Sequence, residues 1–127
     1  MSDSPKDYLV WGEIPVRDLN RAIAFYCAAT GAELEVEHAG PNPVVFFKPK
    51  NVETGIALHL YEGVPAGDGR GPTLHLAAEG RLEDALGRAS SAGAEIVSDP
   101  ISVPGGRFAY IKDPDGNSVS LFEASAA

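Results

Sequence analysis

The feature that most restricts the fold of this chain is an internal repeat. The segment TGAEL at residues 30–34 returns as AGAEI at residues 92–96. In each half a short apolar segment and an amphipathic stretch precede this Gly-Ala pair, and a further apolar segment follows it. The same order in both halves predicts two β-α-β units of similar size in a chain of 127 residues.

The stretch before each Gly-Ala pair has the periodicity of an amphipathic helix. Apolar residues recur at the spacing i, i+3, i+4, i+7, which places them on one helical face. They are Leu19, Ala22, Ile23 and Tyr26 in the first half, and Leu82, Ala85, Leu86 and Ala89 in the second. Asp18 is a predicted N-cap for the first helix. Gly31 and Gly93 fall where helices end in a left-handed residue.

Two more strands are expected to close each half. They are residues 44–48 and 55–62 in the first half, and residues 107–112 and 117–123 in the second. The sequence DPDGN at 113–117 predicts a hairpin turn between the last two strands. The fold class is therefore predicted as α+β, with two β-α-β-β-β modules.

The boundary between the modules follows from composition. The segment GVPAGDGR at residues 63–70 is rich in glycine and proline, as linkers are. The chain is thus predicted as one domain, residues 1–127, with module one at about 8–62 and module two at about 71–124.

The charge of the chain disfavours several partners. It has 18 acidic and 10 basic residues, a net charge of −8, whereas nucleic-acid binding needs clustered Lys and Arg. No apolar run approaches the roughly 20 residues of a membrane span, and MSDSPKDY lacks the apolar segment of a signal peptide. A single cysteine, Cys27, is consistent with a reducing compartment. We expect a cytoplasmic protein that binds neither nucleic acid nor membrane.

Strand alternation assigns two different faces to the predicted sheets. In the first strand Val10, Gly12, Ile14 and Val16 suit a helix-facing core, and the other face carries Glu13. In the second half His75 takes the place of Glu13, at the same offset that relates the two Gly-Ala pairs. The remaining aromatic and polar residues of this second face are predicted to bind a small molecule in a cleft. They are Trp11, Tyr61, Thr73, Ser118, Ser120 and Phe122.

Two segments carry a family resemblance. WGEIPVRDLNRAIAFY at residues 11–26 and KDPDGNSVSLFE at residues 112–123 resemble the vicinal oxygen chelate superfamily, which includes glyoxalase I, bleomycin resistance proteins and extradiol dioxygenases. The opening form is most similar to small proteins related to lactoylglutathione lyase. The resemblance covers about residues 10–123 and implies that the two modules form a curved mixed-sheet cup. It also implies a homodimer.

The resemblance implies a metal site whose usual positions are mostly altered here. Metal-using members take ligands from the first and fourth strands of each module. Those positions fall on Trp11, Thr73 and Ser120, with the remaining one on either Ala57 or His59. At most one ligand survives, so true glyoxalase I activity is not expected.

Three other side chains suggest a shifted site. Glu13, His59 and His75 each lie two residues beyond an altered position, about 6.6 Å along a strand. Two histidines and one carboxylate are a known set for iron, so one hypothesis is a divalent metal here: iron, zinc, nickel or manganese. The alternative is that no metal binds, and Glu13 and His75 form a hydrogen-bonded pair.

Two functions follow from these alternatives. The first is an enzyme, of lyase, isomerase or dioxygenase type, acting on a small oxygenated metabolite in a cup lined by Glu13, His59 and His75, with Glu13 and His75 catalytic. The second is a metal-free protein that binds or sequesters a small molecule, as bleomycin resistance proteins do. The sequence leaves the choice open.

Overall fold

The computed structural model describes residues 8–38, 41–48 and 57–125. Module one contains one helix, α1, and a four-stranded sheet in the order β1-β4-β3-β2. β1 and β4 are parallel, and the other neighbours are antiparallel. The elements are β1 (Trp11–Val16), α1 (Leu19–Thr30), β2 (Val36–Glu37), β3 (Val44–Phe47) and β4 (Ala57–Glu62).

Module two repeats this plan with one addition. Its sheet has the order β5-β9-β8-β6, again with the first pair parallel, and a fifth strand, β7, also pairs with β8. The elements are β5 (Leu74–Ala77), α2 (Leu82–Ser91), β6 (Glu95–Ile96), β7 (Ile101–Val103), β8 (Gly106–Lys112) and β9 (Ser118–Ala124). The predicted α+β fold of two modules is confirmed, whereas β7 was not predicted. Two positions of the strand predicted at 55–62, residues 55–56, lie outside the described residues.

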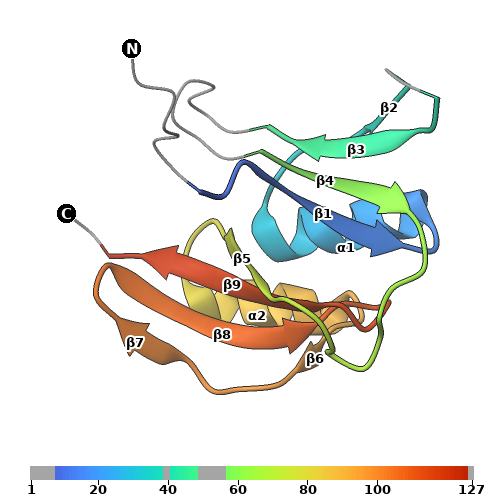
Figure 1. The fold of residues 1–127 in the computed structure, drawn as a ribbon. Helices are drawn as coiled ribbons and strands as arrows, with labels where there is room; N and C mark the ends of the chain where they lie inside the picture. Colours follow the sequence, from blue (N-terminus) through green and yellow to red (C-terminus); the bar gives the residue numbers. More distant parts are fainter. Residues whose placement is uncertain (1–7, 39–40, 49–56, 126–127) are drawn as a thin grey trace, which may run out of the picture.

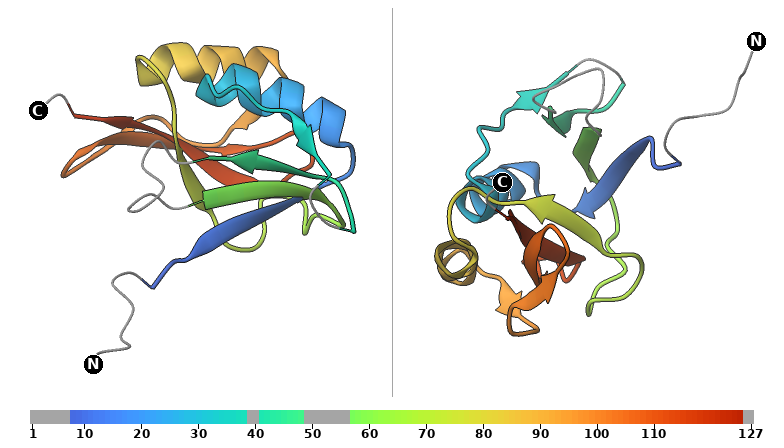
Figure 2. Two further views of the ribbon diagram at one scale, coloured as in Figure 1. Left: turned by 90° about the horizontal axis from the view of Figure 1, so that it is seen from above. Right: turned by 90° about the vertical axis from the view of Figure 1, so that its left-hand side faces the viewer.

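The two sheets share one side of the molecule (Figure 1). Both helices lie together on the opposite side, where they cover the sheets and contact each other (Figure 2). Each sheet therefore has a helix-covered face and an open face. No helix in the described parts of the chain is long and apolar enough to cross a membrane.

The predicted alternation is confirmed along most of the first strand. Ile14 and Val16 are buried beneath the helices, as are Leu58 and Leu60 from β4. Val10 was assigned to the same core, but 65% of it is exposed, because β1 begins only at Trp11. Alternation is a property of the paired strand and does not extend to residues that precede it.

Both predicted ends of α1 are confirmed. The Asp18 carboxylate accepts hydrogen bonds from the Asn20 and Arg21 amides at 2.9 and 3.2 Å. Gly31 ends the helix with φ of 83°, a conformation that favours glycine. These local signals fix where the helix begins and ends. They therefore also limit where β1 must end before the helix and where β2 can begin after it.

The DPDGN turn of module two packs against α1 of module one. Asp113 and Asp115 are both buried there. The Tyr26 hydroxyl donates to Asp113 Oδ2 at 2.6 Å, and Arg21 pairs with Asp115 at 3.2 Å. Burial, followed by the nearby Asp113 charge, raises the pKa of Tyr26 well above its ordinary value. The two segments that carry the family resemblance thus contact each other across the modules.

Candidate functional site

The open face of module one carries an acid–histidine pair in close contact. Glu13 on β1 lies directly opposite His59 on the parallel strand β4. His59 Nε2 is 2.9 Å from Glu13 Oε1, and the two side chains are 17% and 54% exposed. A carboxylate that accepts from an imidazole and remains accessible can bind a ligand donor or accept a proton.

Module two has a polar pair in the equivalent row. His75 on β5 lies opposite Ser120 on β9, and Ser120 Oγ is 2.5 Å from His75 Nδ1. His75 is exposed, whereas Ser120 is completely buried. Ser120 was predicted to contact a ligand directly. In the structure its hydroxyl is bonded to His75 Nδ1, and the residue has no exposed surface.

Glu13 and His75 do not pair with each other, which corrects the alternative drawn from the sequence. Glu13 contacts His59 and His75 is hydrogen-bonded to Ser120, so each has its partner within its own module. The physical reason is that β1 and β5 belong to different sheets, and each has its polar partner on the adjacent parallel strand. The repeat thus explains why the two residues occupy equivalent places.

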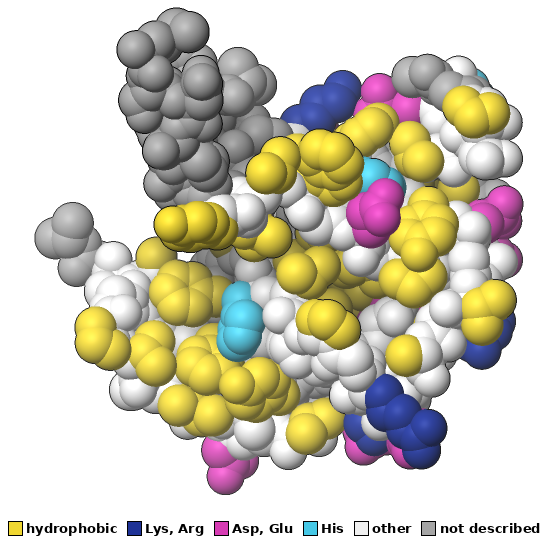
Figure 3. All heavy atoms as spheres, viewed as in Figure 1, with side chains coloured by type: hydrophobic (Ala, Val, Ile, Leu, Met, Phe, Trp, Pro, Cys, Tyr) yellow, Lys and Arg dark blue, Asp and Glu magenta, His cyan; other side chains and the backbone are white. Residues whose placement is uncertain are grey.

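Aromatic rings flank both histidines. His59 contacts Phe46 and Tyr61, and His75 contacts Phe108 and Tyr110; all four contacts are edge-on, with ring centroids 5.0 to 6.2 Å apart. Figure 3 shows this face of the molecule, on which histidine side chains lie among hydrophobic ones. Three of these rings were missed by sequence reasoning: Phe46, Phe108 and Tyr110. The repeat offered a signal, since Phe46 and Phe108 are related by the same offset as Glu13 and His75.

The other residues predicted to bind a ligand lie on the strands of the two sheets, except Thr73, which directly precedes β5. Trp11 is 56% exposed at the start of β1. The hydroxyls of Thr73 and Ser118 form a hydrogen bond with each other. Tyr61 and Phe122 are half-buried. Trp11 lies opposite Ala57 on β4, and Glu13 lies opposite His59.

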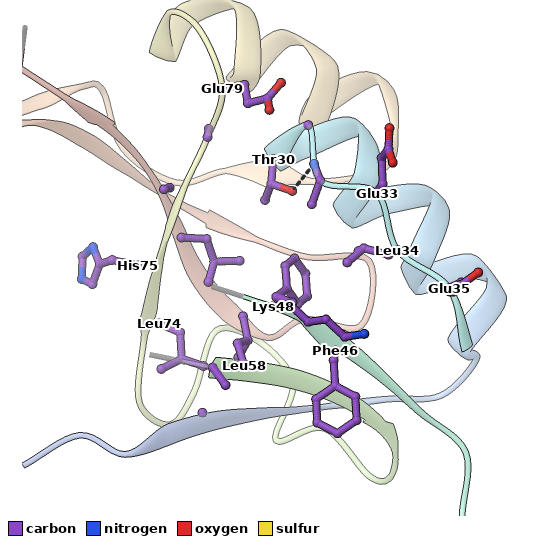
Figure 4. A pocket seen from close by; sticks show the side chains of 18 of the residues that line it. Thr30, Glu33, Leu34, Glu35, Phe46, Lys48, Leu58, Leu74, His75 and Glu79 are labelled. Carbon is purple, nitrogen blue, oxygen red and sulfur yellow. Dashed lines mark hydrogen bonds between the residues drawn. The ribbon is translucent and has the colours of Figure 1, made fainter. Parts of the chain in front are cut away.

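A cleft of about 980 Å³ is lined by residues of both modules. Figure 4 shows Leu58 and Leu74 directed into it from opposite sides, while His75 points to the other side of β5, at the cleft margin. Aliphatic and aromatic side chains of both modules form its walls, and acidic side chains surround one end. The apolar lining includes Phe46, Phe47, Leu58, Leu74 and Leu76, and the acids are Glu33, Glu35, Glu37 and Glu79.

The described residues do not form the metal site suggested by the sequence. Among them, no three His, Cys, Asp or Glu side chains lie close enough together to hold an ion. Glu13 and His59 meet, but His75 is held by Ser120. Two donors are fewer than the three protein ligands of the usual catalytic sites, so the described side chains do not fit the group that the fold family implies.

The fold and the paired rows of its two modules agree with the family comparison. The model of the Glyoxalase/Bleomycin resistance protein/Dioxygenase superfamily matches residues 7–121. The chain belongs to this superfamily. No match was found among curated proteins.

Solved structures share the fold along nearly the whole chain. A glyoxalase/bleomycin resistance protein from Albidiferax ferrireducens is 20% identical, with a TM-score of 0.70 over 94% of this chain and 100% of that one. A second protein of that description, from Streptomyces sp. CB03234, is 27% identical, with a TM-score of 0.64 over 89% and 97%. TnmS3, an antibiotic binding protein from the same organism, is 26% identical, with a TM-score of 0.64 over 96% and 100%.

Proposed function

We propose that this protein binds a small organic molecule without a metal, in the cleft between its modules and on the adjoining open face of module two. The cleft is the main observation that supports this proposal. A pocket with apolar walls and a few polar groups at its margin is the usual form of a small-molecule site, and about 980 Å³ is a suitable volume. His75, at the margin, supplies a polar group beside Phe108 and Tyr110.

One of the similar solved structures supports a binding function. One protein that is 26% identical over nearly all of its length is described as an antibiotic binding protein. Binding of this kind needs shape and apolar surface and no catalytic group. The acidic end of the cleft and the net charge of −8 disfavour strongly anionic ligands.

Filling the cleft should abolish binding. In Leu74→Trp, the larger side chain would fill part of the cleft that Leu74 lines, so we expect a small aromatic probe, 2-acetylnaphthalene, to bind at least about tenfold more weakly. Val64→Trp is the control, because Val64 is 88% exposed and does not line the cleft. Calorimetric titration measures the affinity, and circular dichroism verifies the fold. Equal affinities for Leu74→Trp and the parent would place binding elsewhere.

A second candidate function is proton transfer, favoured by the contact between Glu13 and His59. A substrate C–H proton would pass to the exposed Glu13 carboxylate, while His59 Nε2–H donates to its other oxygen. Return of that proton to a neighbouring carbon would complete an isomerisation. Of the enzyme activities considered, isomerisation by proton transfer is the one that the Glu13–His59 pair supports.

Hydrogen exchange tests the second candidate. Dihydroxyacetone in D₂O should lose its C–H signals in the proton NMR spectrum faster with the parent protein than with Glu13→Gln, by about 100-fold if Glu13 is the general base. Glu33→Gln, a change at the acidic end of the cleft, is the matched control and should exchange like the parent. A rate unaffected by Glu13→Gln would remove this candidate.

The homodimer and the cytoplasmic location stay predictions.

A further inference from the structure

The contact between Ser120 and His75 has a consequence for what His75 can bind. The Ser120 hydroxyl has one hydrogen, and it lies in a residue with no exposed surface. Its hydrogen-bond partner among the described side chains is His75 Nδ1, at 2.5 Å. A buried hydroxyl hydrogen without an acceptor would cost free energy, so the arrangement that satisfies it has Ser120 donating to Nδ1.

This arrangement fixes the tautomer of His75. When Nδ1 accepts a hydrogen bond, a neutral imidazole carries its proton on Nε2. The edge-on rings of Phe108 and Tyr110 restrict rotation of the His75 ring, at centroid distances of 5.0 and 5.8 Å. The exposed nitrogen of His75 is therefore an N–H donor. A metal ion needs the opposite, a free electron pair on that nitrogen.

His59 reaches the same tautomer by another route. Its Nε2 lies 2.9 Å from Glu13 Oε1, and an ionised carboxylate only accepts hydrogen bonds. His59 therefore also carries a proton on Nε2, and that proton is already used within the protein. Of the two histidines, His75 is the one whose Nε2–H remains available to a ligand.

We infer that Ser120 is a positioning residue that holds His75 as an outward-facing Nε2–H donor, and that His75 selects a ligand with a hydrogen-bond acceptor, such as a carbonyl oxygen, instead of a metal ion. The choice of ligand rests on the proposed binding function; the tautomer does not. An acceptor placed over Phe108 and Tyr110 would receive the His75 proton while the apolar part of the ligand enters the cleft.

The tautomer is tested by ¹⁵N NMR of the imidazole side chains at about pH 8.5, where imidazole is ordinarily neutral. The parent should show a protonated Nε2 and an unprotonated Nδ1 for His75, and one equivalent of Zn²⁺ should leave both resonances unmoved. Ser120→Ala should shift both toward the values of a freely exchanging imidazole, whereas Ser90→Ala, at an exposed serine of α2, should not. A protonated Nδ1 in the parent, or a zinc-induced shift of His75, would overturn the inference.

Ligand selection is tested with two probes of the same shape. 2-Acetylnaphthalene has a carbonyl oxygen where 2-isopropenylnaphthalene has a CH₂ group. The parent should prefer the ketone by about fivefold, the size of one neutral hydrogen bond. Ser90→Ala should keep this preference, and His75→Phe should lose it. Equal binding of both probes to the parent would refute the acceptor role alone, whereas failure of both to bind would refute the proposed function and leave the NMR result to decide the tautomer.

Discussion

Replacing Asp113 with alanine is expected to lower the free energy of unfolding by about 3 to 5 kcal/mol. The carboxylate is 4% exposed and accepts four hydrogen bonds of 2.6 to 2.9 Å. The donors are the Tyr26 hydroxyl, the Asp115 and Asn117 amides, and the Asn117 side chain. Alanine would leave several of these donors without an acceptor in a place that water reaches poorly.

Urea denaturation of matched variants measures this loss. Asp113→Asn keeps the shape and one acceptor oxygen, but its amide group would face the Tyr26 or Asn117 donors, so it should be less damaging than alanine. Glu95→Ala is the control: its side chain is 69% exposed, and its pair with Lys112 should contribute about 0 to 1 kcal/mol. A cost below about 1 kcal/mol for Asp113→Ala would show that the turn holds its place without this carboxylate.

Gly116→Ala should also be strongly destabilising, by about 2 to 4 kcal/mol. Gly116 has φ of 82°, which strains any residue with a Cβ, and an added Cβ would lie 2.8 Å from the Asp68 amide nitrogen and 3.1 Å from Gly67 Cα. Those atoms belong to the linker backbone, so they cannot move aside as a flexible side chain would. The substitution would push the linker away from the DPDGN turn.

Gly80→Ala separates the two parts of this cost. Gly80 has a similar φ of 76°, but nothing lies within 4 Å of the Cβ position. It should therefore show the backbone strain alone, about 1 kcal/mol. Thermal and urea unfolding of both variants give the difference between strain and contact. Equal costs at the two positions would mean that the linker yields to the added methyl group.

Local signals in the sequence were enough for both ends of α1 and for the buried face of β1, although they did not predict β7. Asp18 can cap α1 because its carboxylate reaches amides two and three residues away, and Gly31 ends the helix through its own backbone conformation. Alternation likewise identified the buried side chains Ile14 and Val16. Each of these depends on near neighbours in the chain. The prediction that Val10 is buried was wrong because the start of a strand depends on its partner strand.

The aromatic surroundings of the histidines needed more than local patterns. Phe108 and Tyr110 lie on β8, a strand whose alternation had not been assigned to a face, and they reach His75 only through the β5-β9-β8 order of the sheet. That order depends on the pairing of β5 with β9, two segments that the whole of α2, β6, β7 and β8 separates along the chain. Periodicity within one segment carries no information about the order of the strands in the sheet.

The sequence by itself determined the repeat, the α+β class, the equivalence of Glu13 and His75, and the face on which they lie. Only the tertiary structure decided their partners: Glu13 meets His59, and His75 meets Ser120. The reason is that spacing along a strand fixes which side a residue faces, whereas its neighbour on that side depends on strand order and register. These arise when the whole module packs beneath its helix.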